Sequence, residues 1–305
     1  MKTLLLIDAN SLIHRCFHAL PPLTTPDGRP SQALYGVASI LIKLWREEKP
    51  DYAAALFDRP EPTFRKEEYP AYKAQRPPAP QTLISQIIEA HELFLRFGIE
   101  TFEQPGFEAD DLIATLTKKF SSHPDLRIMI LTGDLDTLQL VEGDTVVVRT
   151  LKRGVTDTIT YNHDAVLGRY GLEPKQLIDY KALVGDPSDN VKGVPGIGPK
   201  TASRLLKQFG SLKRLYEKPD EDKKLKEKLK SFQKQAEQSQ KLIALRSDIE
   251  LKTDQLADLK IQDDLSRLAR YFKTLGFETL IKRIESNKLG PGANSSRGSS
   301  QTRMF

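Results

Sequence analysis

Three short apolar segments, each followed closely by an aspartate, constrain the fold of this chain more than any other feature. They are TLLLID at 3–8, YAAALFD at 52–58 and RIMILTGD at 127–134. A continuous apolar run of this length is typical of a parallel strand that helices cover on both faces. Helical patterns separate the three runs, and two further strands are expected between about 145 and 160. The sequence therefore predicts an α/β fold with a mostly parallel central sheet flanked by helices; the helical patterns lie at about 31–48, 82–97 and 109–120.

Composition narrows the environment and the partners of the chain. No apolar run among the 305 residues approaches membrane-spanning length, and Asp8 interrupts the N-terminal run, which predicts a buried strand instead of a signal peptide. The single cysteine, Cys16, excludes an internal disulfide framework and favours a reducing compartment, so we expect a cytoplasmic protein with no membrane partner. A net charge of +5 favours a polyanionic partner only mildly.

Many carboxylates are predicted to converge at one edge of the sheet. Ligands of open α/β sheets bind beyond the carboxyl ends of the strands, where the aspartates of the three apolar runs stand. GFEADDLIATL at 106–116 begins a helix expected at the same edge, and VGDPSDN places two aspartates at i, i+3, a spacing that suits a helical turn. One acid would be enough to complement a helix dipole, so this number needs another explanation. The nine acids are Asp8, Asp58, Glu108, Asp110, Asp111, Asp134, Asp136, Asp186 and Asp189.

Such a density of negative charge requires cations. Unpaired charges in a partly buried site cost several kcal/mol each, roughly, and hard divalent ions with oxygen ligands remove that cost. Mg²⁺ keeps several waters, so we expect many of the acids to act through bound water. A zinc site is disfavoured, because the only closely spaced histidines, His14 and His18, lack a third ligand and favour packing or solvent contact. Two cations in an acidic cleft suit in-line attack of water on a phosphodiester.

The segment FDRPEPTFRKEEYPAYKAQRPPAP at 57–80 interleaves aromatic and basic residues. Aromatic rings stack on bases and cations neutralise phosphates, a combination that grips single strands. Because the segment leaves the acidic edge at Asp58, we expect Lys73 or Arg76 to contact the scissile phosphate. The alternative is an ordinary surface loop balanced by its own glutamates. The aromatic and basic residues are Phe64, Tyr69, Tyr72, Arg59, Arg65, Lys66, Lys73 and Arg76.

The stretch GVPGIGPKTASRLLKQFGS at 193–211 predicts a tight turn before a helix. Its glycines permit the turn, and the helix N-terminus can receive a phosphate. Contact through backbone amides carries no base information, so any specificity would be for the shape of duplex DNA. The alternative is a simple helix–helix turn. The candidate DNA-binding residues here are Gly193, Gly196, Gly198, Lys200, Thr201 and Arg204.

Two further segments complete the organisation. From Tyr170 onward the pattern is helical throughout, and the lysine-rich run at 221–235 favours a solvated helix face over a dedicated binding surface. The Gly- and Ser-rich segment at 286–305 is expected to be disordered.

Six motifs together resemble, in order and spacing, the N-terminal 5′-nuclease domain of bacterial DNA polymerase I and its flap endonuclease relatives. The resemblance covers about residues 1–285 and implies a PIN-like (resolvase-like) core at 1–170 with a helical arch at about 57–82. It also implies a helical DNA-binding region at 171–285 with a helix-hairpin-helix at about 190–211. The motifs are DANSLIHRCFHALP, FDRPEPTFRKEEYPAYKAQRP, GFEADDLIATL, TGDLDTLQLV, YGLEPKQLIDYKALVGDPSDN and GVPGIGPKTA.

The resemblance implies a division of labour among the candidate residues. Asp111 is similar to the acid near two metal ions, Asp58 to one that acts through water, and Arg15 to a basic residue beside the cleft. Tyr72, Lys73 and Arg76 match arch positions that steer or activate the scissile phosphate, and Arg65 and Lys66 are candidate DNA contacts. The ligands of one metal would be Asp8, Glu108, Asp110 and Asp134, and those of the other Asp136, Asp186 and Asp189.

The same resemblance implies an activity, cofactors and partners. We expect a monomeric, divalent-metal-dependent 5′-3′ exonuclease and flap endonuclease that acts on branched or nicked DNA and on RNA primers during replication and repair. Mg²⁺ is the expected ion, Mn²⁺ a substitute, and K⁺ is a candidate ligand of the hairpin; a separate DNA polymerase is a candidate partner. Ala9, His14 and Lys192 depart from the usual family residues, although every metal-site acid is present. The alternatives are a non-catalytic protein that binds branched DNA and an RNA-directed nuclease of the wider PIN class.

Overall fold

The computed structural model describes residues 1–154, 157–217, 223–262 and 264–287, and it confirms the α/β architecture. Its main sheet has the strand order β3-β2-β1-β4-β5-β6, parallel except for the edge strand β6, which is antiparallel to β5. The strand β3 was not predicted, because ETFE is short, polar and partly exposed at the other edge. The strands are β1 (Lys2–Asp8), β2 (Tyr52–Phe57), β3 (Glu100–Glu103), β4 (Leu126–Thr132), β5 (Val146–Arg153) and β6 (Asp157–Tyr161).

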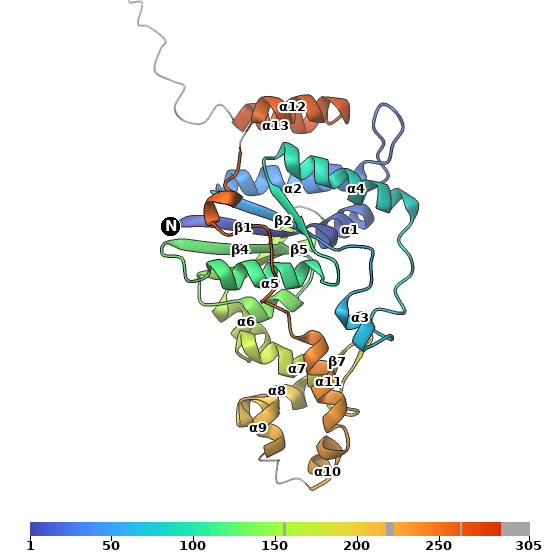
Figure 1. Ribbon diagram of the computed structural model, residues 1–305, viewed down its shortest axis with the longest axis vertical. Helices are drawn as coiled ribbons and strands as arrows, with labels where there is room; N and C mark the ends of the chain where they lie inside the picture. The colour runs from blue at the N-terminus through green and yellow to red at the C-terminus, as the bar shows by residue number, and fades with distance from the viewer. Residues whose placement is uncertain (155–156, 218–222, 263, 288–305) are drawn as a thin grey trace, which may run out of the picture.

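Helices cover both faces of the sheet, as the apolar strands require (Figure 1). Side chains of β1 alternate between two cores: Leu5 and Ile7 enter one, and Leu4 and Leu6 enter the other. The first core is covered by α1 (Ala9–Ala19), α2 (Gln32–Glu48) and α4 (Gln81–Arg96). The second is covered mainly by α5 (Ala109–Phe120) and α6 (His163–Tyr170), with the 3₁₀ helices η1 (Asp136–Leu140) and η3 (Leu256–Leu259).

A third core lies mainly in the region after Tyr170, includes Tyr72 of the segment at 57–80, and holds the predicted hairpin. The prediction of continuous helix there was wrong in two places. Residues 245–255 are not helical, and two short strands pair antiparallel where a turn at Pro187–Asn190 joins them. Asp186 ends the first strand and Asp189 lies in this turn, in which Asn190 adopts φ +57°. The two aspartates are therefore held by a β-turn and not by a helical turn. The elements are η2 (Pro174–Gln176), α7 (Leu177–Val184), β7 (Gly185–Asp186), β8 (Val191–Lys192), α8 (Pro199–Phe209), α9 (Leu212–Glu217), α10 (Lys223–Ser231) and α11 (Gln233–Ile243).

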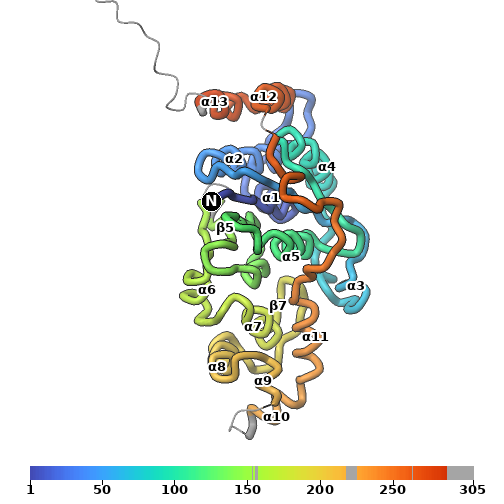
Figure 2. Tube along the Cα trace, turned by 60° about the vertical axis from the view of Figure 1, so that its left-hand side comes forward, coloured from blue at the N-terminus to red at the C-terminus, as the bar shows by residue number. Residues whose placement is uncertain are grey.

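The last two helices pack on the first core. Phe272 of α12 (Leu265–Thr274) and Leu280 of α13 (Glu278–Asn287) are buried with α2 and α4, at the end of the molecule opposite α8–α10 (Figure 2). The end of the predicted region 171–285 thus packs on the first core, away from the hairpin. Of the expected disordered segment, residues 288–305 lie outside the described residues, as do 218–222 of the lysine-rich run and its surroundings. No helix within the described ranges has the length and apolar character needed to span a membrane.

Candidate active site

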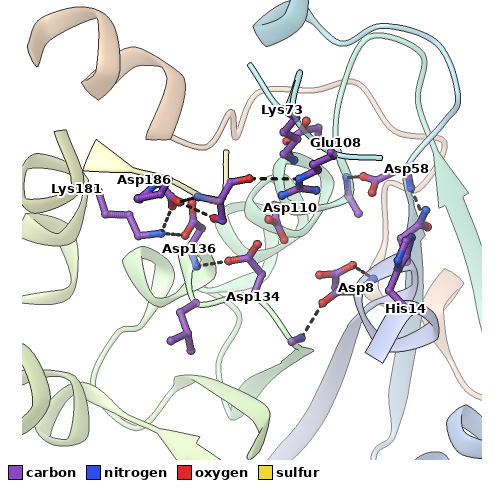
Figure 3. A pocket seen from close by; sticks show the side chains of 18 of the residues that line it. Asp8, His14, Asp58, Lys73, Glu108, Asp110, Asp134, Asp136, Lys181 and Asp186 are labelled. Atoms are coloured by element: carbon purple, nitrogen blue, oxygen red, sulfur yellow. Dashed lines mark hydrogen bonds and ion pairs between the residues drawn. The ribbon is translucent and has the colours of Figure 1, made fainter. Parts of the chain in front are cut away.

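A cavity of about 660 Å³ opens at the carboxyl edge of the parallel strands (Figure 3). The ends of the strands and the start of α5 position its acids: Asp8 ends β1 and caps α1, accepting the Ser11 N–H at 3.0 Å. Glu108 caps α5, and Asp58 accepts the Ala109 N–H at 2.7 Å. The structure therefore brings together most of the predicted acids; those lining the cavity are Asp8, Asp58, Glu108, Asp110, Asp134, Asp136 and Asp186.

Burial and neighbouring carboxylates raise the pKa values of two of these acids. Burial, followed by the charge of Asp58, raises the pKa of Asp8 to about 7, against the opposing hydrogen bond from Thr132. Burial and the neighbouring charges of Asp8 and Asp134 raise the pKa of Asp110 well above its usual range. The Oδ1 atom of Asp110 is buried and has no hydrogen-bond partner among the described residues. Like charges and an unpartnered buried oxygen fit a site that a divalent cation completes.

The acidic side chains of the cleft do not converge on a single position. Within the described ranges, no three Asp, Glu, His or Cys side chains meet closely enough to hold a metal ion. Some of these carboxylates form ion pairs with basic side chains instead, which explains part of the distance between the acids. Lys181 of α7 contacts Asp136 and lies 2.8 Å from Oδ2 of Asp186. Burial alone would raise the pKa of Asp186, but hydrogen bonds from Lys181 and Ser188 outweigh it and lower that pKa.

Lys181 was missed by the sequence prediction. In DYKALVGD, Lys181 stands five residues before Asp186. It therefore lies on the preceding helix, α7, and outside the acidic motif that drew attention to Asp186. The structure assigns it to the cavity lining beside the predicted second group of metal acids. The ammonium group of Lys181 can balance the negative charge of those acids when no metal ion is bound.

The basic segment at 57–80 meets the cleft as predicted, although only α3 (Phe64–Glu68) is helical before α4 begins. The Tyr72 hydroxyl is buried 3.0 Å from both Glu108 Oε2 and Asp189 Oδ2. Lys73, with φ +52°, places Nζ 3.0 Å from Glu108, and Arg76 pairs with Asp189. Burial lowers the pKa of Lys73, but the carboxylates of Glu108 and Asp189 outweigh it and raise the pKa. Lys73 and Arg76 therefore supply positive charge at the cleft.

Asp111 and Arg65 require a correction. Their forked ion pair has N–O distances of 2.6 and 2.7 Å, and both side chains are almost fully buried, outside the cavity lining. With its oxygens facing Arg65, Asp111 does not reach the cleft as the predicted metal acid. Arg65 cannot contact a DNA phosphate because its guanidinium is only 1% exposed. The sequence could not show that this cation points inward while Lys73 and Arg76 of the same segment line the cleft.

The remaining predicted DNA contacts divide into two groups. Lys66 donates to the Tyr72 carbonyl at 3.0 Å, and Arg15 donates to the Lys152 carbonyl at 3.1 Å, outside the cavity lining. Lys200 and Arg204 are exposed and Thr201 is half-buried on α8, whose N-cap is Gly198. Gly193 must be glycine, because a Cβ there would lie 2.3 Å from the Val184 backbone.

A further cation from the lysine-rich run joins the hairpin. A Cβ on Gly196 would lie 2.7 Å from Nζ of Lys228, so this amine lies against the turn. Gly196 itself adopts φ +74°, which favours glycine. The part of the lysine-rich run that α10 carries therefore lies against the hairpin through Lys228, which a solvated helix face did not predict.

An acidic cleft at the carboxyl edge of a parallel sheet, overhung by a basic segment and joined to a helical hairpin region, defines the resolvase-like class of α/β protein. Residues 3–171 match the family model "5'-3' exonuclease, N-terminal resolvase-like domain", and residues 172–266 match "5'-3' exonuclease, C-terminal SAM fold". The chain belongs to the 5′-3′ exonuclease family, which confirms the family predicted from the six motifs.

Curated relatives agree with this assignment. The chain is 38% identical over 286 residues to the 5′-3′ exonuclease of Aquifex aeolicus, covering 93% of this chain and 96% of that protein. It is 40% identical over 286 residues to DNA polymerase I of Bacillus subtilis, covering 93% of this chain. The match spans only 32% of that polymerase.

Solved structures confirm the fold. The T5 D15 protein co-crystallised with metal ions superposes with a TM-score of 0.65 at 20% identity, covering 93% of this chain and 98% of that one. The catalytic core of Rad2 in complex with a DNA substrate gives a TM-score of 0.62 at 19% identity, covering 93% and 92%.

Proposed function

We propose that this chain is a structure-specific, divalent-metal-dependent 5′-nuclease that hydrolyses phosphodiesters in branched, flapped or nicked DNA. The observation that carries the proposal is one cavity in which seven carboxylates meet Lys73 and Arg76, on a chain that also presents an exposed hairpin. The relatives named 5′-3′ exonuclease and DNA polymerase I support it. RNA–DNA junctions and primers, met during replication and repair, belong to the same proposal.

The acids of the cleft suit two ions with oxygen ligands. Mg²⁺ or Mn²⁺ bound there would activate water and neutralise charge that develops on the phosphate. The unpartnered Oδ1 of Asp110 and the raised pKa of Asp8 mark oxygens that gain most from a cation. One group of ligands would be Asp8, Glu108, Asp110 and Asp134, with Asp58 acting through water. The other would be Asp136 and Asp186 with Asp189, which lies outside the cavity lining and pairs with Arg76.

The basic segment would hold the reacting phosphate against this cleft. Lys73 and Arg76 line the cavity and carry fixed positive charge toward it. When a phosphate enters, their ammonium and guanidinium groups can move from carboxylate to phosphate oxygens, and so stabilise negative charge. Tyr72 stays neutral, because burial raises the pKa of its hydroxyl, followed by the charges of Glu108 and Asp189. It therefore orients these carboxylates by hydrogen bonding.

The hairpin would bind the duplex arm of the substrate. The free backbone amides of the first turn of α8 form the positive end of its helix dipole, and Lys200, Arg204 and Lys228 add charge at this part of the molecule. These contacts favour duplex shape over sequence. K⁺ at the hairpin, a monomeric state, a cytoplasmic location and cooperation with a separate polymerase belong to the same proposal.

Cleavage of a 5′-labelled double-flap DNA tests the function directly. We expect product near the junction with Mg²⁺, none with EDTA, and none from an Asp134→Ala variant whose fold is verified by circular dichroism. Tight flap binding without product in Mg²⁺ or Mn²⁺ would make the chain a non-catalytic binder of branched DNA. Cleavage of single-stranded RNA in preference to the flap would instead favour an RNA-directed nuclease.

A further inference from the structure

Arg65 differs from the other cations of the basic segment in where it points. Among the described residues it is the largest side chain with an exposure below 2%. Lys73 and Arg76, from the same segment, line the cavity, whereas Arg65 turns beneath it toward the start of α5. A buried guanidinium needs partners for its five donors, so its contacts show what it holds together.

Three separate segments meet at this guanidinium. Asp111, in the first turn of α5, accepts its two terminal nitrogens at 2.6 and 2.7 Å. The carboxyl end of α11 provides two carbonyls: Leu242 accepts from Nε at 2.7 Å and Ala244 accepts from Nη2 at 3.2 Å. Arg65 itself belongs to α3, within the basic segment at 57–80 that was predicted to form an arch. The guanidinium therefore joins this arch segment to α5 and α11.

Glu108 lies directly beside this joint. Its carboxylate is 3.5 Å from Nη1 of Arg65, and its backbone N–H donates to Asp111 at 3.2 Å. Asp111 also accepts the Arg246 N–H at 2.8 Å, just beyond α11. The position of Glu108, an acid of the cleft, is thus set by the same carboxylate that holds Arg65 and the chain after α11.

The helix α11 also contacts the chain at the start of the hairpin. Ser239 of α11 donates to the Lys192 carbonyl at 2.7 Å, and Gln235 of α11 donates to the Gly193 carbonyl at 2.5 Å. Figure 1 shows α11 running beside α7 toward α3, and the two helices share the third core. One short helix therefore makes direct contacts with the proposed duplex site at one end and with Arg65 at the other.

We propose that Arg65 and Asp111 form a positioning pair that holds the arch base and α11 against the start of α5, and so sets Glu108 relative to a duplex bound at the hairpin. This inference rests on the proposed function. Stability alone does not require such a pair, because apolar residues of similar volume often replace a buried ion pair at no cost. The forked geometry instead fixes orientation, which an apolar contact does not.

The test compares the wild type with the double variant Arg65→Met, Asp111→Leu, which removes both charges together. Three quantities are measured: Mn²⁺ affinity by electron paramagnetic resonance, flap affinity in Ca²⁺, and the single-turnover cleavage rate in Mg²⁺. We expect flap affinity within about twofold of wild type, weaker Mn²⁺ binding, and a rate lower by about tenfold to a hundredfold, the usual effect of a small misplacement.

Arg149→Met is the matched control. Arg149 is a buried guanidinium that pairs with Glu47 and with Glu48 at 2.6 Å, on β5 and outside the cavity lining. Its loss should lower the melting temperature while the rate per folded molecule and the Mn²⁺ affinity stay at the wild-type values. A folded double variant with wild-type rate and Mn²⁺ affinity would overturn the positioning role.

A conservative variant keeps the test decisive if the double variant does not fold. Arg65→Lys retains the charge but loses the fork, so we expect its rate to fall without a matching loss of flap affinity. A wild-type rate in this variant would also overturn the proposal. If the wild type itself cleaves nothing, the proposed function fails, whereas the Mn²⁺ titration still reports whether the pair positions Glu108.

Discussion

At the scale of single residues, the cleft contains carboxylates that destabilise one another. Asp8 is buried and Asp110 is half-buried beside further acids, and the buried Oδ1 of Asp110 has no partner among the described residues. Asp110→Asn removes one of these charges, so we expect the free energy of unfolding in EDTA to rise by about 1–2 kcal/mol. Urea denaturation measures the gain, and an Mn²⁺ titration should show weaker binding. A less stable variant with unchanged Mn²⁺ affinity would contradict this account of the acids.

The raised pKa of Asp8 gives a pH dependence with a definite sign. A carboxyl whose pKa rises on folding from 3.8 to about 7 binds its proton more tightly in the folded state. Its contribution to stability is present below the unfolded pKa and is lost as the pH rises through about 7. The melting temperature in EDTA should therefore fall between pH 5 and pH 8 more for the wild type than for Asp8→Asn. Equal slopes for the two proteins would exclude this contribution.

At the scale of elements, we expect the basic segment at 57–80 and the hairpin to have separate tasks. Lys73 lies 3.0 Å from an acid of the cleft, whereas Lys200 is exposed on α8. Lys73→Ala should lower the single-turnover rate by about a hundredfold with little change in flap affinity. Lys200→Ala should mainly raise the flap concentration needed for half-maximal rate. Parallel losses of rate and affinity in both variants, measured on proteins of equal stability, would contradict the division.

The elements also show how much the sequence could predict. Continuous apolar runs identified β1, β2 and β4, and the aspartates after them identified the cleft, because both features depend on local pattern and strand order. The strand β3 and the β7–β8 pair were missed, since neither carries an apolar pattern and the second depends on a four-residue turn. The inward direction of Arg65 depends on carbonyls at Leu242 and Ala244, far away in the sequence, which no local pattern reveals.

At the scale of the whole molecule, the chain closes its first core with helices that come from its far end. Phe272 of α12 is completely buried, and its ring centroid lies 5.9 Å from that of Phe97 and 6.0 Å from that of Phe277. The motifs predicted a helical DNA-binding region through this point, because amphipathic helices look alike whether they pack beside a hairpin or return to a sheet. Figure 2 shows these helices and the hairpin region at opposite ends.

That separation predicts that stability and activity can be changed independently. Phe272→Ala removes a ring from a closed core, so it should lower the free energy of unfolding by about 3–5 kcal/mol in urea denaturation. Its rate and flap affinity per folded molecule, measured well below the melting temperature, should match the wild type because the cleft and the hairpin do not contact Phe272. A fall in flap affinity at full folding would mean that α12 and α13 contribute to substrate binding, and the duplex would then contact both ends of the molecule.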